Sequence, residues 1–117
     1  METELKSYPA LPPSGGRELR LLAEAASEFW DIPLEELKSK TRTMEIVWPR
    51  NVCMSIARNS GCTCNKVAKW WKKKEHGTVI NATRMVQNLR DTRPAYDKQF
   101  RQFSEFAKSY IKKRKLP

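Results

Sequence analysis

Apolar residues recur at intervals of three and four along most of the chain, which is the spacing of amphipathic helices. The first such run starts at Arg17 and ends before Pro33. A short helix is predicted next over residues 33–37, because a proline and acidic residues are both favourable in a first helical turn. The polar, basic segment 38–43 has no apolar period, and we expect it to be a surface loop.

Four further helices are predicted after this loop. Pro49 is expected to open a helix that stops at Gly61, and Thr63 is the predicted N-cap of a short helix reaching about residue 73. Further helices are predicted over 77–89 and 95–111, with a break at 91–94. The apolar positions that should form the core are Leu19, Leu22, Ala23, Ala26, Phe29, Trp30, Val52, Cys53, Ile56, Ala57, Val67, Ala68, Trp71, Val79, Ile80, Ala82, Val86, Leu89, Tyr96, Phe100, Phe103, Phe106, Ala107 and Tyr110.

The pattern predicts an all-α fold, a helical bundle of about six helices, because no segment alternates with a period of two and no long repeat is present. A chain of 117 residues has room for one domain. We expect a flexible Pro/Gly-containing arm over 1–16, the folded domain over 17–111 and a basic tail over 112–117. With neither a secretory signal nor an apolar run near the roughly 18 residues of a membrane span, we expect a cytoplasmic protein without membrane contact.

Charge is unevenly distributed along the chain. Residues 1–37 hold three basic and eight acidic side chains, whereas residues 38–117 hold twenty basic and five acidic ones. The formal net charge of +10 therefore comes from the second part, which contains most of the predicted helices. A folded segment of such positive density favours a polyanionic partner, first of all nucleic acid, although a well-solvated basic surface is an alternative.

The order of helices after residue 49 is that of a helix-turn-helix, with the turn near residues 72–75. The recognition helix of such a motif presents its N-terminal residues to base edges in the major groove of DNA. Lys donates to guanine, Glu accepts from cytosine, Asn pairs with adenine, and Thr serves bases or phosphate. The residues in this position have suitable chemistry and are Lys74, Glu75, His76, Gly77, Thr78 and Asn81.

The run Trp71-Lys-Lys-Lys-Glu-His-Gly-Thr-Val-Ile-Asn-Ala82 resembles the signature of the C-terminal DNA-binding domain of the bacterial replication initiator DnaA. In that family the run reads aromatic, Gly, Gly, Arg, Asp, His, Thr, Thr, Val. The stretch from Ile32 to Thr43, followed by Val47-Trp-Pro-Arg50, is similar to the preceding helix, basic loop and Pro-Arg segment of the same family. The resemblance covers about residues 18–90 and implies a helical bundle of the Trp-repressor/DnaA C-terminal type.

The resemblance implies a role for individual positions. Arg42 matches the basic-loop arginine that enters the minor groove. The positions implied to face bases in the major groove are Lys74, Glu75, His76, Gly77, Asn65 and Ile80. The positions implied to contact phosphates are Arg50, Asn51, Thr63, Lys66, Lys72, Lys73, Thr78 and Asn81. These roles agree with general chemistry, because a narrow A·T-rich minor groove attracts arginine and phosphate contacts fix the register on the duplex.

Three departures from the family pattern concern the same motif. Lys72 and Lys73 replace the Gly-Gly turn, so one lysine is expected to take a strained backbone conformation unless the turn changes. Lys74 replaces a planar arginine fork with a point charge, and Gly77 lacks the hydroxyl and methyl of a threonine. Recognition of the family's box is expected to be relaxed, altered or lost.

No cofactor is expected, and the chain lacks the G-x-x-x-x-G-K-[ST] phosphate loop of the initiator's ATPase module. We therefore expect no ATP-binding module in this chain, whether it is an excised domain or a stand-alone relative from a mobile element or phage. Zinc is disfavoured, because Cys53, Cys62, Cys64 and His76 do not have a common finger spacing. The three cysteines are expected to be small packed residues. A catalytic Cys–His pair is likewise disfavoured, so no enzyme is expected.

The predicted function is sequence-specific binding of double-stranded DNA in replication initiation or its regulation, at the nucleoid. The alternatives are a nonspecific DNA-binding domain, an RNA-binding protein and a protein-interaction module. The last alternative rests on adjacent Trp70 and Trp71, which cannot both face one core, so that one is expected to be exposed. It would be a partner patch, a surface that stacks on deoxyribose, or a lone exposed aromatic, which is the commonest case.

Overall fold

A computed structural model of the chain describes residues 16–73 and 77–115. Six helices lie within these residues and no strand does, which confirms the all-α fold class. The helices are α1 (Gly16–Trp30), α2 (Leu34–Leu37), α3 (Met44–Asn59), α4 (Cys64–Trp70), α5 (Gly77–Thr92) and α6 (Pro94–Lys115). The predicted arm lies outside this part of the chain except for Gly16, where α1 begins.

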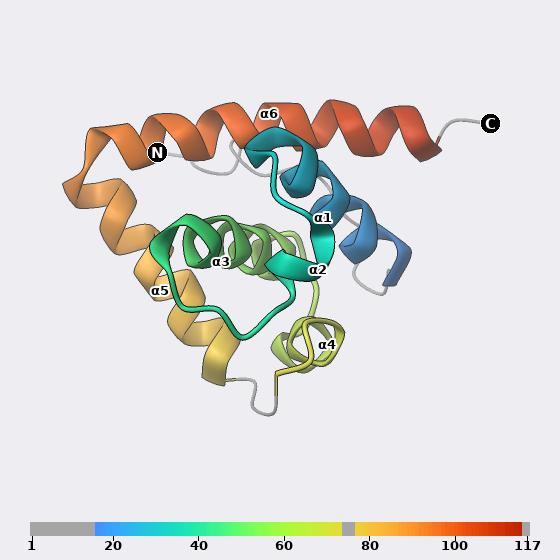
Figure 1. The fold of residues 1–117 in the computed structure, drawn as a ribbon, viewed down its shortest axis with the longest axis horizontal. Coiled ribbons are helices and arrows are strands. Elements are labelled where there is room, and N and C mark those ends of the chain that lie inside the picture. The colour runs from blue at the N-terminus through green and yellow to red at the C-terminus, as the bar shows by residue number, and fades with distance from the viewer. Residues whose placement is uncertain (1–15, 74–76, 116–117) are drawn as a thin grey trace.

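Helix α3 lies at the centre of the bundle and packs mainly against α5, while α1 packs mainly against α6 (Figure 1). In Figure 1, α6 runs along the upper edge, and α4 and the start of α5 lie at the lower edge. The loop between α2 and α3 descends toward the same lower edge. This arrangement separates α6 from the connection between α4 and α5.

The core follows the predicted periodicity closely. Trp71, Phe100 and Phe103 are the largest fully buried side chains, and they come from the end of α4 and from α6. Most of the other predicted apolar positions are buried as well. The predicted core residues that are only half-buried are Phe29, Trp30, Ile80, Leu89, Tyr96, Phe106 and Tyr110. None of the helices in the described ranges is long and apolar enough to span a membrane.

The predicted start of the third helix is wrong, because α3 begins at Met44 and contains Pro49 in its interior. Proline at that position lacks the N–H that would bond the Glu45 carbonyl, an arrangement that costs about 3 kcal/mol. Burial of Ile46 and Trp48, which are 8% and 4% exposed, offsets this cost. Residues 44–48 are therefore helical, although sequence alone placed the proline at the helix start.

The end of α3 agrees with the prediction at Gly61. This glycine has φ 114° and follows the C-cap Ser60. The Cys62 N–H donates to the Ala57 carbonyl at 3.1 Å, and the Gly61 N–H donates to the Arg58 carbonyl at 3.1 Å. Together these bonds form a Schellman motif, in which a residue of positive φ closes the helix.

The last helix is longer than predicted, because α6 continues to Lys115 instead of ending at Ile111. Ile111 is buried, and the Arg114 guanidinium lies 3.7 Å from the centre of the Tyr110 ring one turn earlier. These contacts extend the helix into the segment expected to be a tail. Lys112, Lys113 and Arg114 are thus part of a helix and exposed on its surface.

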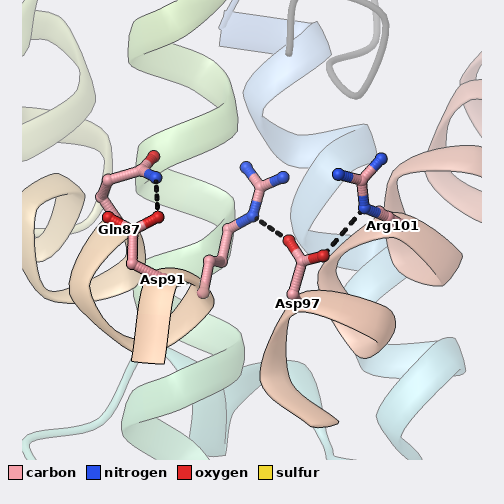
Figure 2. Close-up of polar contacts among 5 residues, drawn as sticks. Gln87, Asp91, Asp97 and Arg101 are labelled. Atoms are coloured by element: carbon pink, nitrogen blue, oxygen red, sulfur yellow. Dashed lines mark hydrogen bonds and ion pairs between the residues drawn. The ribbon is translucent and has the colours of Figure 1, made fainter. Parts of the chain in front are cut away.

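A carboxylate fixes the junction between α5 and α6, where only Arg93 separates the two helices. The Asp97 carboxylate accepts hydrogen bonds from Arg90 Nε at 2.8 Å and Arg101 Nε at 2.9 Å (Figure 2). Partial burial raises the pKa of Asp97, but the two arginines lower it more, so the net pKa lies below its usual value. The Arg90 guanidinium also lies 4.0 Å from the centre of the Phe100 ring.

Candidate nucleic-acid interface

The loop over residues 38–43 forms one side of the candidate interface. Lys40 and Arg42 are exposed, whereas Ser39 and Thr41 are half-buried. The Ser39 hydroxyl donates to the Glu36 carbonyl at 2.6 Å, and the Thr41 N–H donates to the Ser39 hydroxyl at 3.2 Å. Arg42, the residue expected in a minor groove, is therefore on the surface of a loop with a local polar turn.

Arg50 lies beneath this loop and is only 6% exposed. Its Nε donates to the Leu37 carbonyl at 2.8 Å, and its Nη2 donates to the carbonyls of Ser39 and Thr41 at 2.9 and 3.1 Å. This placement does not fit the phosphate contact expected for Arg50, because a group that reaches DNA must be exposed. Burial lowers the pKa of the guanidinium but leaves it in the charged range typical of arginine.

Lys73, at the end of the α4 region, faces the same loop. Partial burial lowers its pKa below the usual value of 10.5. The positive charges of Arg50, Arg42 and Lys40 lower it further. Because these groups repel one another across a short distance, a polyanion bound between them would be stabilised by all four charges.

A second cation joins the loop to α4. The Lys38 ammonium lies 3.8 Å from the centre of the Trp70 ring. Burial lowers the pKa of Lys38, and the nearby charges of Lys72 and Arg20 lower it further. The loop and the end of α4 therefore form one cationic surface, although they are separated by about thirty residues in the sequence.

Helix α4 presents polar residues at its N-terminus. The Thr63 hydroxyl accepts a hydrogen bond from the Lys66 N–H at 3.2 Å, which confirms the predicted N-cap. Asn65 and Lys66 are exposed, as base and phosphate contacts require. Thr63 is exposed too, and its hydroxyl has the structural role of a cap.

The turn after α4 has the strained lysine that the sequence suggested. Lys72 has φ 59°, in the left-handed region, and its N–H donates to the Lys69 carbonyl at 3.0 Å. The Lys73 N–H donates to the Ala68 carbonyl at 2.8 Å, which completes a Schellman motif. A lysine thus occupies the position where such motifs usually have glycine. Its side chain is exposed.

The start of α5 also presents polar groups. Thr78 and Asn81 are exposed, and Ile80 is half-buried. Nothing lies within 4 Å of the position that a Cβ on Gly77 would take. The packing of the described residues therefore does not require glycine there. Lys74, Glu75 and His76, which precede this helix, lie outside the described residues.

Asn51 is less accessible than a phosphate contact suggests. It is half-buried, and its Nδ2 donates to the Met85 sulfur at 3.1 Å, which ties α3 to α5. The expected contact between Asn51 and a phosphate therefore requires that this bond be replaced or shared.

The cations of the interface are not neutralised by carboxylates within residues 16–73 and 77–115. The ion pairs formed there involve Arg20 with Glu24, and Asp97 with two arginines at the α5–α6 junction. None includes a residue of the 38–43 loop, α4 or the turn that follows. An external polyanion would thus meet uncompensated positive charge.

The cysteines are packed as the sequence suggested. Cys53 and Cys62 are buried and Cys64 is half-buried. Burial raises the pKa of the Cys53 thiol well above its usual value, so this residue is a protonated, apolar core member. No group of three or more metal-ligating side chains occurs in the described part of the chain.

The adjacent tryptophans divide between core and surface. Trp71 is 1% exposed, whereas Trp70 is half-buried and packs edge-on against Trp71. Away from this pair, Trp30 and Trp48 both donate to the Gln99 side-chain oxygen, at 2.8 and 2.6 Å. These two indoles border a cleft of about 590 Å³ whose wall includes Tyr96 and three carboxylates.

Sequence reasoning missed two residues of the cationic surface, Lys38 and Lys40. The signal was the run Lys38-Ser-Lys-Thr-Arg-Thr43, in which basic residues alternate with small polar ones. A search for basic residues in the connections between predicted helices, in addition to helical periods, would have found them.

Comparison with known proteins supports the similarity suggested by these residues. Residues 20–86 match the family model described as bacterial dnaA protein helix-turn-helix. The chain is 31% identical over 96 residues to the chromosomal replication initiator protein DnaA of Enterococcus faecalis, which covers 81% of this chain and 22% of that protein. It is 30% identical over 81 residues to the DnaA of Acinetobacter baumannii, covering 68% and 17%. The chain thus spans about a fifth of the length of these relatives.

Proposed function

This chain belongs to the bacterial DnaA helix-turn-helix family, and from that premise we propose that it binds double-stranded DNA in a sequence-specific way. The observation that supports this proposal best is the single cationic surface formed by the 38–43 loop and the end of α4. A surface of uncompensated lysine and arginine beside a helix-turn-helix matches the charge and shape of a duplex.

In the proposed complex, the N-terminus of α5 enters the major groove. Lys74, Glu75 and His76 precede this helix and would face base edges there, with Gly77, Ile80 and Asn65 nearby. The groups proposed for phosphates are Thr63, Lys66, Lys72, Lys73, Thr78, Asn81 and Asn51. Phosphate contacts of this kind fix the orientation of the helix and supply salt-dependent affinity.

The 38–43 loop is proposed to enter the adjacent minor groove with Arg42. An exposed arginine on an extended loop suits this role, because A·T-rich minor grooves are narrow and strongly negative. The cation cluster around Lys73 joins the charges of Lys40 and Arg42 in the loop to the residue that follows the α4 turn. It would therefore meet the phosphates that separate the two grooves.

Gly77 is proposed to alter which bases are preferred. The family has threonine here, and the open space around Gly77 means that a threonine would fit without a clash among the described residues. Restoring it with Gly77→Thr adds a hydroxyl and a methyl group at the groove surface. We expect this substitution to change the selected DNA motif while the thermal stability stays within about 1 kcal/mol of the wild type.

The proposed biological role is binding of a DnaA-box-like site in replication initiation or its regulation, at the nucleoid. A nonspecific DNA-binding or protein-interaction domain of a mobile element or phage, having lost box specificity, is the alternative. The cleft bordered by Trp30 and Trp48 is where the interaction alternative would place its partner. The matched region lies within this chain without the initiator's phosphate loop, so no ATP hydrolysis is proposed for it.

Selection from a random duplex library tests the proposal. The selected duplex is then titrated at two salt concentrations with wild type, His76→Ala and Arg42→Ala. Arg93→Ala is the matched control, because Arg93 is an exposed arginine in the connection between α5 and α6. We expect enrichment of a short motif, loss of that enrichment with His76→Ala, and weaker binding of A·T-rich sites with Arg42→Ala.

The other outcomes separate the alternatives. Salt-sensitive binding without an enriched motif would indicate a nonspecific DNA-binding domain. Preference for single strands in a competition assay would indicate an RNA or single-strand binder. Absence of binding to any nucleic acid would contradict the proposal and favour the interaction domain. An effect of Arg93→Ala equal to that of Arg42→Ala would show that net charge alone determines binding.

A further inference from the structure

We propose that Arg50 is a positioning residue, which holds the 38–43 loop so that Arg42 is directed toward the DNA. The proposal rests on the function proposed above for Arg42, and it replaces the phosphate contact expected for Arg50 from sequence. In this proposal the minor-groove contact depends on two arginines. Arg42 contacts the groove, and Arg50, buried in the bundle, fixes the loop.

The first step of the argument is the pattern of acceptors. Arg50 donates to the carbonyls of Leu37, Ser39 and Thr41, which are alternate residues of the chain. Leu37 is the last residue of α2, and residues 38–40 form a turn. Hydrogen bonds from one guanidinium to three carbonyls spread over this turn therefore fix the course of the segment.

The burial of the loop residues follows the same alternation. Ser39 and Thr41 are half-buried, whereas Lys40 and Arg42 are exposed. The bonds to Arg50 favour the observed arrangement, in which the two cations are outward.

Few other contacts hold the middle of the loop. Residues 40–42 make no backbone-to-backbone hydrogen bond with other described residues. The Thr41 N–H bonds only to the Ser39 hydroxyl within the loop. The Arg50 guanidinium, which comes from the rigid helix α3, is thus the main polar connection between this segment and the bundle.

The charge of Arg50 supports a role beyond packing. A buried cation is costly unless it is paired, and no carboxylate pairs with Arg50 in the described ranges. The three carbonyls accept hydrogen bonds from Nε and Nη2 but do not neutralise the charge of the guanidinium. The loop is therefore held by a group that also increases the positive potential below Arg42, which favours a polyanion on the outer side.

Lysine cannot replace this arginine, because an ammonium lacks the planar fork that reaches three separated carbonyls. Arg50→Lys keeps the charge and therefore separates geometry from electrostatics. The test measures binding of the selected duplex by wild type, Arg50→Lys, Arg42→Ala and the double variant, at two salt concentrations. We expect Arg50→Lys to weaken binding by no more than Arg42→Ala does, and to cause no further loss in the Arg42→Ala background.

A direct phosphate contact by Arg50 would give a different result. The loss caused by Arg50→Lys would then be as large in the Arg42→Ala background as in the wild type. That result would overturn the positioning role.

Backbone order parameters of residues 39–42, measured without DNA, keep the test independent of the function proposed for Arg42. We expect values near the rigid limit of about 0.85 in the wild type and below about 0.6 in Arg50→Lys, with α1 and α6 unchanged. An equally rigid loop in Arg50→Lys would overturn the positioning role even if Arg42 binds DNA. If the loop loosens but Arg42→Ala leaves binding unchanged, the function proposed for Arg42 fails while Arg50 is confirmed as the residue that orders the loop.

Discussion

The two connections on either side of α4 have the same hydrogen-bond pattern and different chemistry. After α3, the left-handed position of the Schellman motif is Gly61, and the next helix starts with the Thr63 cap. After α4, the equivalent position is Lys72. The first connection is built for stability, whereas the second accepts backbone strain and places a cation on the candidate interface. Strain is not confined to the candidate interface, because Asp31, at the cleft bordered by Trp30 and Trp48, also has a positive φ of 55°.

Replacing Gly61, in the connection between α3 and α4, should have the largest effect on stability. Gly61→Lys forces a side chain into a backbone conformation at φ 114°, and we expect a loss of about 2 kcal/mol in the free energy of unfolding. Urea denaturation measures this loss. An unchanged midpoint would contradict the view that the first connection needs glycine.

Relieving the strain at the second connection should act in the opposite direction. We expect Lys72→Gly to raise the free energy of unfolding by about 1 kcal/mol, because glycine has no left-handed penalty. The same variant should lower the salt slope of duplex binding by about 0.9. Lys72→Asn is the control, because asparagine tolerates this conformation but removes the charge. A gain in stability with no loss in DNA binding would show that Lys72 does not contact a phosphate.

Removing the Thr63 cap of α4 should change the free energy of unfolding by about as much as the substitution at Lys72. Thr63→Ala removes the acceptor of the Lys66 N–H, and we expect it to cost about 1 kcal/mol. Thr63→Ser keeps the hydroxyl and should cost only a few tenths. Thermal unfolding of the three proteins distinguishes a cap from a residue that contacts only DNA, whose loss would leave the melting temperature unchanged.

The α5–α6 junction differs from both connections because its contribution to the free energy of unfolding depends on pH. Asp97→Asn should cost about 0.5 kcal/mol at neutral pH, since partly exposed ion pairs contribute modestly. The folded pKa of Asp97 is lowered, so its stabilisation is present above the usual value of 3.8 and is lost as the pH falls through the folded pKa. The difference between wild type and variant should therefore vanish in acid. A difference that does not depend on pH would contradict this account.

The elements that depend on local sequence were predictable. Gly61 and Thr63 act through their own backbone and side chain, so the end of α3 and the cap of α4 could be identified from residue type. The strain at Lys72 could be anticipated, because its replacement of a family glycine leaves a turn that still needs positive φ. The apolar periods predicted the core because helical spacing determines which side chains face inward.

The errors arise where distant contacts decide the outcome. Pro49 indicated a helix start, but burial of Ile46 and Trp48 against other elements extends α3 backward to Met44. The resemblance implied a phosphate contact for Arg50, whereas the structure leaves only 6% of this residue exposed. Its buried position depends on the path of a loop with no periodic signal. For the same reason Lys38 and Lys40 were not recognised as part of the interface.

The proposal that this domain binds duplex DNA through the loop and the α4–α5 region can be tested most directly by mapping amide resonances. The chain, of 13.7 kDa, is suitable for a two-dimensional spectrum recorded during titration with the selected duplex. The account predicts large shifts for residues 38–43, the N-terminus of α4, residues 71–73 and the first turn of α5, with α6 almost unchanged. Shifts concentrated on α6 or around the cleft at Trp30 and Trp48, or no shifts at all, would contradict it.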